Sequence, residues 1–307
     1  MEMNIRKGLR FVVALLAVVL LVACTQTEEQ ADVNTVSSAN LAKVEHEFKI
    51  HHNDDLKQRV ISKEEMALLP PEFKKIYDRG VLIVAMYSED RYPYFFIDSK
   101  GNLVGNDVDL AYDIAEKLGV RLEFVRTART FDGIVDQVAR GEADLAISKL
   151  SITLPRAMKV SYTTPYLILR QTLLVNRLQL ARIRTEDGNL LQTISKSDLK
   201  IGVKANTSYV AYAKEVFPKA TIIEYEGYDS IMEAAVQGEL FAAFYDENEV
   251  ATYIQKNPDK AIHVQVLPLE ERVDPLGIAV SRDADHFLAW LNHYLLLYEQ
   301  KGGTAHE

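Results

Sequence analysis

Short apolar runs alternate with amphipathic segments through the middle of the chain. Residues 81–85 form a continuous apolar run, which is typical of a strand buried on both faces, and residues 122–125 and 144–147 are two further strand candidates. An amphipathic helix is predicted from Asn106 to Gly119, and a second one, capped by Thr130, ends at Gly141. This alternation predicts the α/β class with a largely parallel sheet.

The same alternation returns in the second half of the chain. Strands are predicted at 199–203, 221–225 and 240–245, and helices at 208–217 and 230–237. Residues 137–146 are echoed by residues 234–243, an offset of 97, and in both a helix stops at a Gly-Glu pair before an apolar strand. That offset is the size of a small domain, so we predict two similar lobes rather than a solenoid.

Polar residues follow one buried strand in each predicted lobe. Ser148 and Lys149 come after the strand at 144–147, and Asp246 and Glu247 come after the strand at 240–245. Ligands of open α/β sheets bind beyond the carboxyl ends of the strands. Two such ends that face each other predict a ligand cleft between the lobes.

The first 24 residues have the pattern of an export signal. Three basic residues precede an apolar run over 11–23, which is shorter than the roughly 20 residues that a membrane-spanning helix needs. The run ends in Leu-Val-Ala-Cys, which resembles the lipobox of bacterial lipoproteins and implies that Cys24 is acylated and becomes the mature first residue. An ordinary signal peptide with an incidental cysteine, or a short buried helix, is the alternative. Thr25 follows the cysteine at the position where an aspartate would favour retention in the inner membrane, so a location in the outer membrane stays open.

Composition excludes several classes of protein. The chain has 35 Lys and Arg against 44 Asp and Glu, and removal of residues 1–23, with three basic residues and one acidic residue, lowers the net charge from −9 to −11. This acidic balance gives no reason to expect a nucleic-acid partner. Cys24 is the only cysteine, which excludes an internal disulfide and a zinc site of several thiolates.

Two segments precede the first lobe. A flexible tether is predicted for residues 24–45, and an extension packed on the first lobe is predicted for residues 46–75.

Three phrases resemble family 3 of the bacterial extracellular solute-binding proteins, the polar amino-acid receptors of ABC importers. They are Gly-Asn-Leu-Val-Gly-Asn-Asp-Val-Asp-Leu at 101–110, Ser-Lys-Leu-Ser-Ile-Thr-Leu-Pro-Arg at 148–156 and Thr-Pro-Tyr at 164–166. The resemblance covers about residues 75–300, and segment 144–166 is its most specific part. It implies the two-lobed type II periplasmic binding fold, which is shared with the ligand-binding domain of ionotropic glutamate receptors.

The resemblance also implies a carboxylate site in the first lobe. Arg156 stands where the family's arginine clamps the ligand's α-carboxylate, and a guanidinium can form two parallel charge-assisted hydrogen bonds to such a group. Ser151 aligns with the residue that supports this arginine, and Ser148 with a backbone acceptor for the ligand's ammonium. The alternatives are a surface arginine on the first turn of a helix and an ordinary serine at a strand end.

Further ligand contacts are implied around the cleft. Phe131 aligns with an aromatic that lines it, Thr207 with a second contact to the carboxylate, and Asp246 with the acid that takes the ligand's ammonium. Each position has a structural alternative, namely a core residue for Phe131 and helix caps for Thr207 and Asp246. An unpaired carboxylate at the end of an apolar strand is costly to desolvate, which favours the ammonium role for Asp246.

The chain departs from the family pattern at two places. Ser88 stands where receptors for basic amino acids have an acid, and Lys149 replaces a small residue. Both departures argue against lysine or arginine as the ligand and favour a polar or acidic one, unless Lys149 simply points into solvent.

We therefore predict a lipid-anchored binding protein of the periplasm or cell surface, acting as a monomer that captures an amino acid-like ligand by hinge closure. Lobe 1 is expected at 76–170 and 275–307, lobe 2 at 171–274, and the hinge near 167–170 and 274–277. The partner is an ABC permease, or alternatively a membrane sensor. No cofactor or metal is expected and the motifs of common enzymes are absent, although this fold also carries cyclohexadienyl dehydratase activity.

Overall fold

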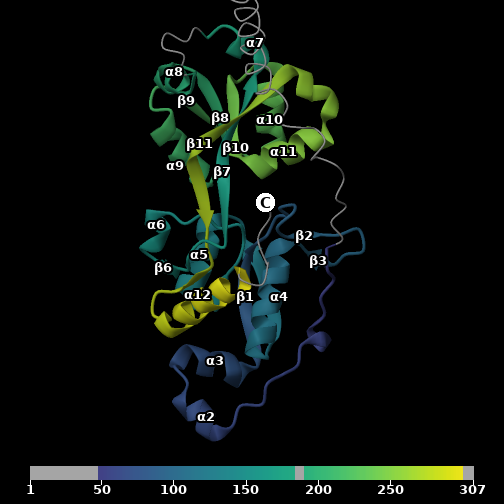
Figure 1. Cartoon of the computed structure of the whole chain (residues 1–307), viewed down its shortest axis with the longest axis vertical. Coiled ribbons are helices and arrows are strands. Elements are labelled where there is room, and N and C mark those ends of the chain that lie inside the picture. The colour runs from purple at the N-terminus through teal and green to yellow at the C-terminus, as the bar shows by residue number, and fades with distance from the viewer. Residues whose placement is uncertain (1–47, 184–189, 300–307) are drawn as a thin grey trace, which may run out of the picture. The chain divides into compact units, whose positions relative to one another are not determined.

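Two α/β lobes, each built on a five-stranded sheet with helices packed on it, make up the described part of the chain (Figure 1). The computed structural model describes residues 48–183 and 190–299, so the predicted signal peptide 1–23, Cys24 and the tether 24–45 lie outside it. The predicted fold class is confirmed. None of the helices within the described ranges combines the length and the apolar character that a bilayer crossing requires.

The strands of the first lobe are β1 (Val81–Tyr87), β2 (Phe96–Ile97), β3 (Leu103–Val104), β4 (Arg121–Ala128), β5 (Leu145–Ala146), β6 (Val160–Tyr162) and β12 (Ala279–Ser281). Its helices are α3 (Pro71–Arg79), α4 (Asn106–Leu118), α5 (Phe131–Ala139), α6 (Leu154–Ala157) and α12 (Asp285–Glu299). The main sheet has the order β4-β1-β5-β12-β6, so the short strand β5 lies at its centre. Apolar helix faces cover this sheet, with Ile114 of α4 and Ile134 of α5 fully buried.

The strands of the second lobe are β7 (Leu167–Asn176), β8 (Lys200–Lys204), β9 (Thr221–Tyr225), β10 (Ala242–Asp246) and β11 (Val264–Leu276). Its helices are α7 (Arg177–Leu180), α8 (Leu190–Lys196), α9 (Ser208–Val216), α10 (Tyr228–Gln237), α11 (Glu247–Lys256) and the 3-10 helix η2 (Pro258–His263). The sheet order is β11-β7-β10-β8-β9, which places β10 at the centre, as β5 is in the first lobe. The two echoed sequence segments therefore supply the central strand of each sheet.

Both sheets are less parallel than the sequence predicted. In each sheet two neighbouring strand pairs are parallel and two are antiparallel. In the second lobe the antiparallel pairs involve β7 and β11, which also connect this lobe to the first (Figure 1). Their first-lobe ends pair Leu167 with Leu276 and Arg170 with Val273, and the register shifts between Pro268 and Val273.

Residues 48–70 run along the first lobe and include the 3-10 helix η1 (Asn53–Asp55) and α2 (Lys63–Leu68). The Asn53 side chain accepts a hydrogen bond from the Leu122 N–H and donates one to the Leu122 carbonyl, so it pairs with the edge of β4. The His51 ring stacks on Tyr112 of α4 with centroids 4.4 Å apart. These contacts attach the extension to the first lobe.

Candidate functional site

Lys149 and Asp246 form a buried ion pair between the two lobes. Lys149 lies three residues after β5, and Asp246 is the last residue of β10. The Lys149 ammonium lies 2.7 Å from Asp246 Oδ2 and 3.2 Å from Glu249 Oε1. The side chains of Lys149 and Asp246 are only 3% and 1% exposed. The carboxyl ends of the two central strands thus meet at an interlobe cleft.

Lys149 is held at both ends, so the interpretation that it points into solvent is wrong. Its backbone has a φ of 48°, in the left-handed region that non-glycine residues rarely adopt. Its N–H donates a hydrogen bond of 2.6 Å to Asp107 Oδ2, and the other oxygen of that carboxyl accepts one from the Tyr166 hydroxyl. The ammonium lies 4.9 Å from the ring centroid of Tyr94 and 5.1 Å from that of Tyr245, within the range of cation–π attraction.

The two oxygens of Asp246 have different partners. Its Oδ1 accepts hydrogen bonds from the N–H groups of Asn248 and Glu249, both at 3.1 Å, and so caps α11. Its Oδ2 accepts from the Lys149 ammonium. The helix cap and the ammonium contact, which the sequence left as alternatives, therefore coexist, but the ammonium belongs to the chain itself.

Arg156 is buried on α6, with 7% of its surface exposed, so it is not a surface arginine. Its Nε donates to Asp132 Oδ1 at 2.8 Å, and its Nη1 donates to the Ser151 carbonyl at 3.1 Å. The Ser151 hydroxyl donates to Asp274 Oδ2 at 3.0 Å and lies 2.9 Å from the hydroxyl oxygen of Ser208, at the start of α9. This serine pair is a second polar contact between the lobes.

The three other predicted ligand residues have partners within the protein. The Ser148 hydroxyl accepts from the Tyr87 N–H at 2.9 Å and is fully buried. Phe131 stacks on Tyr87 with ring centroids 4.8 Å apart and belongs to a buried apolar cluster. The Thr207 hydroxyl donates to the Lys204 carbonyl rather than capping α9. Their ligand roles stay predictions.

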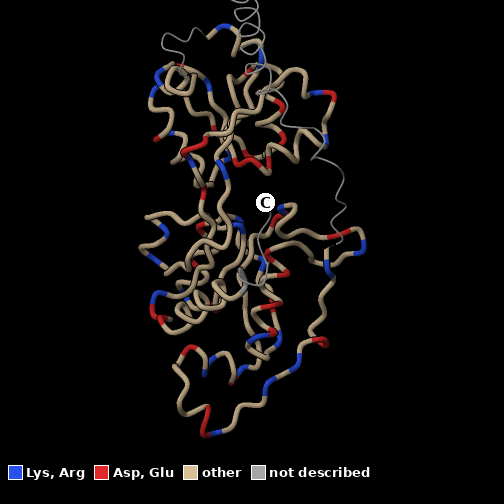
Figure 2. The backbone as a smooth tube through the Cα atoms, in the orientation of Figure 1, with Lys and Arg blue, Asp and Glu red and all other residues tan. Residues whose placement is uncertain are grey.

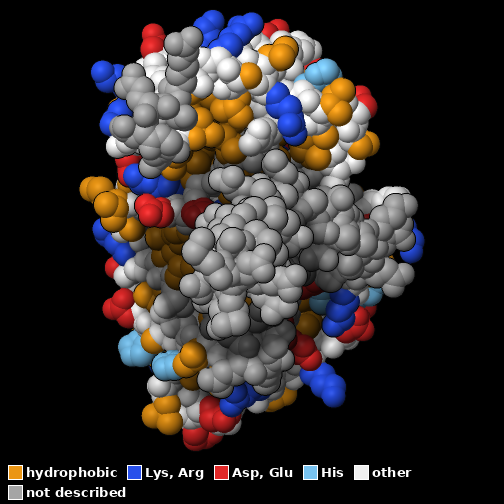
Figure 3. Space-filling view, turned by 45° about the horizontal axis from the view of Figure 1, so that its top comes forward, with side chains coloured by type: hydrophobic (Ala, Val, Ile, Leu, Met, Phe, Trp, Pro, Cys, Tyr) orange, Lys and Arg blue, Asp and Glu red, His pale blue; other side chains and the backbone are white. Residues whose placement is uncertain are grey.

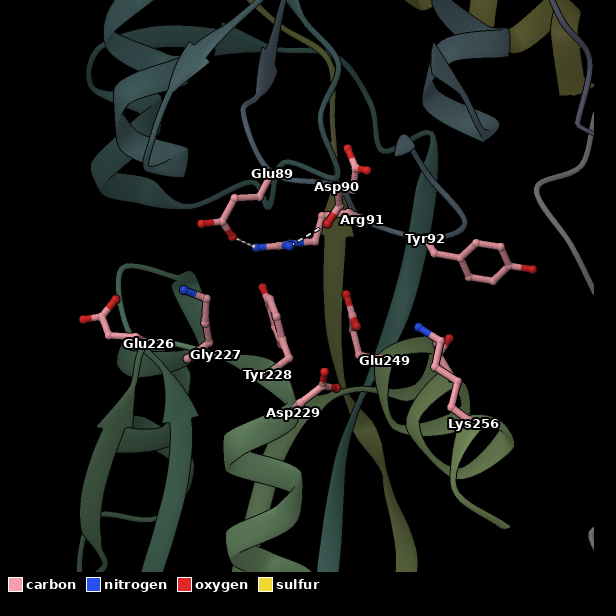
Figure 4. A pocket seen from close by; sticks show the side chains of 12 residues that line it. Glu89, Asp90, Arg91, Tyr92, Glu226, Gly227, Tyr228, Asp229, Glu249 and Lys256 are labelled. Atoms are coloured by element: carbon pink, nitrogen blue, oxygen red, sulfur yellow. Dashed lines mark hydrogen bonds and ion pairs between the residues drawn. The ribbon is translucent and has the colours of Figure 1, made fainter. Parts of the chain in front are cut away.

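A cavity of about 310 Å³ lies between the loop after β1 and the starts of α10 and α11 (Figure 4). Arg91 crosses it, with its guanidinium carbon 4.6 Å from the ring centroid of Tyr228 and 4.9 Å from that of Tyr87. The guanidinium donates to Glu89 Oε2 at 2.9 Å, while Tyr228 and Glu249 point toward it from the second lobe. None of the six predicted ligand residues lines this cavity.

Three buried groups at the cleft have shifted pKa values. It raises the pKa of Asp107 to about 7 and that of Asp274 to about 6, even though both carboxyls accept hydrogen bonds. Burial alone lowers the pKa of Lys149, but the carboxylates of Asp246 and Glu249 outweigh it and hold that pKa well above its ordinary value. Lys149 therefore carries its charge at neutral pH.

Charged side chains lie at the cleft and across the surface. Acidic residues gather at the start of α11, on the edge of the second lobe that faces the first (Figure 2). On the face in Figure 3, basic and acidic side chains are intermixed rather than separated by sign. Within the described residues, no group of three or more His, Cys, Asp and Glu side chains is placed to hold a metal ion.

Sequence reasoning missed several residues of this cleft, among them Arg91, Tyr94, Ser208 and Glu249. It also missed the pairing of Lys149 with Asp246. The signal for that pairing was the offset of 97 residues between the echoed segments, because the two residues are separated by the same number of positions. The signal for Glu249 was helical spacing, since this residue lies three positions after the cap residue Asp246 and so on the same side of the helix.

The sequence of the chain is similar to those of known binding proteins. Residues 83–306 match the bacterial extracellular solute-binding proteins, family 3. A probable histidine-binding protein of Neisseria gonorrhoeae is 26% identical over 68% of this chain and 75% of that protein. The ABC transporter arginine-binding protein 1 of Escherichia coli is 25% identical over 68% of this chain and 82% of that protein.

Two solved structures have similar folds. An ancestral amino acid-binding protein, described as a precursor of cyclohexadienyl dehydratase, is 32% identical with a TM-score of 0.61 and covers 75% of this chain and 94% of its own. A putative binding component of an ABC transporter from Wolinella succinogenes, complexed with lysine, is 26% identical with a TM-score of 0.62 and covers 73% and 92%.

Proposed function

Because the chain belongs to family 3 of the bacterial extracellular solute-binding proteins, we propose that it captures a small amino acid-like ligand and delivers it to an ABC importer. The observation that carries this proposal is the pairing of polar groups across the cleft, Ser151 with Ser208 and Lys149 with Asp246. A ligand that contacts both lobes favours the closed form over the open one, which is the basis of capture by hinge closure.

The hinge is proposed where β7 and β11 connect lobe 1 (76–170 and 275–307) with lobe 2 (171–274). The register shift between Pro268 and Val273 interrupts the ladder beside Arg170 and Thr172. Interrupted pairing leaves fewer backbone hydrogen bonds to resist bending, so the strands can flex there while each sheet keeps its own order. The shift borders the crossings proposed at residues 167–170 and 274–277, which are regularly paired with each other, so bending is expected next to them, where Arg170 and Val273 meet the interruption.

The ligand's carboxylate is assigned to Arg156. Among the residues that the structure describes, two of the five N–H groups of its guanidinium donate, to Asp132 and to the Ser151 carbonyl, so the remaining ones can bind a carboxylate. Ser151 would support this end from the first lobe, and Thr207 would contribute from the start of α9 in the second lobe. Phe131 and Ser148 would line the site beside them.

Export and anchoring are also proposed. Cys24, at the end of the lipobox-like phrase, would be acylated and hold the mature chain at a membrane, in the periplasm or on the cell surface. Cys24→Ser should release the protein, which membrane fractionation and detergent partitioning would show. A Cys24→Ser protein that still partitions with the membrane would contradict the anchor.

We propose a binding role rather than an enzymatic one, because the matched relatives are binding proteins. A dehydratase-like activity and a role as the ligand sensor of a signalling receptor remain the alternatives from the sequence, and no contact in the cleft favours either of them.

A ligand screen tests the proposal. The full chain with Cys24→Ser, exported and purified as a free protein, is heated with each of the twenty amino acids and a set of small carboxylic acids. A ligand at about 100 times its dissociation constant adds about 2.7 kcal/mol of stability, which raises the melting temperature by several degrees. Uptake of the same compound should then require the chain in living cells. A chain that binds none of these compounds would contradict the proposal.

A further inference from the structure

The cleft already contains an ammonium group, that of Lys149. It lies 2.7 Å from Asp246 Oδ2, and the Asp246 side chain is 1% exposed. A buried carboxylate at this place would otherwise attract a cationic group of the ligand, because an unpaired buried charge is costly. Glu249, at 3.2 Å, is also paired with Lys149. A ligand that enters beside Asp246 therefore meets a cation and not a free carboxylate.

Lys149 is not easily displaced by a ligand. Its backbone N–H is tied to Asp107 by a hydrogen bond of 2.6 Å, which fixes the origin of the side chain. The ammonium at the far end lies within 5.1 Å of the ring centroids of Tyr94 and Tyr245. The Tyr94 hydroxyl in turn accepts a hydrogen bond of 2.6 Å from Asn248 of α11. Residues of both lobes thus hold the ammonium in place.

Three cationic side chains at the cleft can donate hydrogen bonds to a ligand, although the cavity beside Arg91 also has carboxylates in its lining. An ammonium has three N–H groups, and Lys149 uses two of them for Asp246 and Glu249. Arg156 uses two of its five N–H groups for described residues, Asp132 and Ser151. Arg91 adds a third cation, and its buried Nε has no hydrogen-bond partner among the residues that the structure describes.

The donors of Lys149 and Arg156 require acceptors on the ligand. The α-ammonium of an amino acid has only donors and finds Asp246 and Glu249 already paired with Lys149, whereas a keto or hydroxyl oxygen at the same carbon can accept the third N–H. A site with donors placed for one group rejects the analogue that cannot pair with them.

We propose that the cleft selects a 2-oxo or 2-hydroxy carboxylic acid over the amino acid of the same carbon skeleton, and that Lys149 determines this specificity. The proposal rests on the proposed function as a binding protein and narrows its ligand class. Arg156 would hold the carboxylate, and Lys149 would donate to the oxygen at the second carbon.

Titration calorimetry with compounds that differ only at that carbon tests the proposal. The probes are L-glutamate, 2-oxoglutarate and 2-hydroxyglutarate, then L-alanine, pyruvate and L-lactate, then L-phenylalanine, phenylpyruvate and phenyllactate, with L-arginine as a cationic reference. The full chain with Cys24→Ser should bind at least one oxo or hydroxy acid at least tenfold more tightly than the matched amino acid. A preference for the amino acid, or for L-arginine, would overturn the inference while leaving the binding function intact.

Variants at Lys149 test its role. Lys149→Gly suits the left-handed backbone and exposes Asp246 to the ligand, so the preference should reverse and the affinity for the amino acid should rise at least tenfold. Lys149→Met keeps the length of the side chain without its charge and should bring the two affinities closer together. Lys219→Gly, at an exposed turn of the second lobe, is the matched control and should change neither affinity.

The double variant Lys149→Gly with Asp246→Asn should lose the gained affinity for the amino acid, because the carboxylate that would bind the ammonium is gone. An affinity ratio that stays within twofold in Lys149→Gly would contradict the role of Lys149, and so would a gain that survives Asp246→Asn. If no probe of either class binds any variant, the proposed function fails together with this inference.

Discussion

Asp246→Asn should open the cleft without unfolding the lobes. Its Oδ1 caps α11 and its Oδ2 binds the Lys149 ammonium. Asparagine keeps an oxygen for the cap but places an NH₂ group where Oδ2 now accepts from the ammonium. The substitution therefore removes the ion pair between Lys149 and Asp246 and leaves the helix cap in place.

The magnitude follows from burial. Removing one partner of a buried ion pair costs about 3–5 kcal/mol, and the lower end applies here because Glu249 still contacts Lys149 at 3.2 Å. In an open form the ammonium reaches water, so the cost falls on closure rather than on unfolding. About 3 kcal/mol changes the ratio of closed to open molecules about 150-fold. A cleft closed in about 99% of wild-type molecules would then be closed in roughly 40%.

Fluorescence energy transfer between the lobes measures this ratio. Cys24 is the only cysteine, so a Cys24→Ser background with Lys117→Cys and Lys219→Cys carries one label on an exposed site of each lobe. Asp246→Asn should lower the transfer efficiency and change the melting temperature little. Glu249→Gln, at a more exposed partner, should open the cleft less, since its side chain is 14% exposed. Unchanged transfer in Asp246→Asn, or a larger effect of Glu249→Gln, would refute the reasoning.

Two further predictions concern the first lobe. Arg156→Lys should weaken the binding of any carboxylate ligand at least tenfold in calorimetry, because an ammonium cannot reproduce the guanidinium fork that contacts Asp132 and Ser151; an unchanged affinity would exclude Arg156 as the clamp. For Asp107, burial raises the pKa from 3.8 to about 7, so between about pH 4 and 7 the folded chain holds a proton that the unfolded chain has lost, and stability falls as pH rises through this window. Asp107→Asn can still pair with the Lys149 N–H and the Tyr166 hydroxyl. In urea denaturation between about pH 4 and 7, the free energy of unfolding of this variant should therefore fall by about 4 kcal/mol less than that of the wild type. An equal fall in both proteins would contradict the buried carboxyl.

Local sequence patterns predicted most of the sheets and the helices around them. The strand at 221–225 is observed with those limits, and the helix at 208–217 is shorter by one residue. Apolar residues recur in these elements with the period of a strand or a helix, so short windows of sequence contain their signal. The same is true of α5, which Thr130 caps as predicted.

The strands that join the lobes were not predicted. β11 contains Pro268 and Pro275, which normally argue against a strand. The prolines are tolerated because β11 is the edge strand of its sheet, where a residue without an N–H need not break a hydrogen-bond ladder. An edge position is a property of the assembled sheet, and no local window contains it.

The pairing of Lys149 with Asp246 connects the sequence repeat to the cleft and leads to a last prediction. Both residues lie four positions after the first residue of the central strand of their lobe, 97 residues apart, so the pair lies where the two repeats face each other. The burial of Lys149 therefore depends on the other lobe, which is why its polar surroundings in the sequence gave no sign of it.

If this pair acts as one unit, its two halves should be strongly coupled. Lys149→Met and Asp246→Asn should each open the cleft, since each leaves one buried group of the pair without its partner. The double variant replaces the pair by two neutral groups, so its closed fraction should recover toward that of the wild type, with an interaction energy of about 2–3 kcal/mol in the transfer measurement. Opening equal to the sum of the two single effects would show that the residues act independently, and Lys149 would then need another reason to be buried between the lobes.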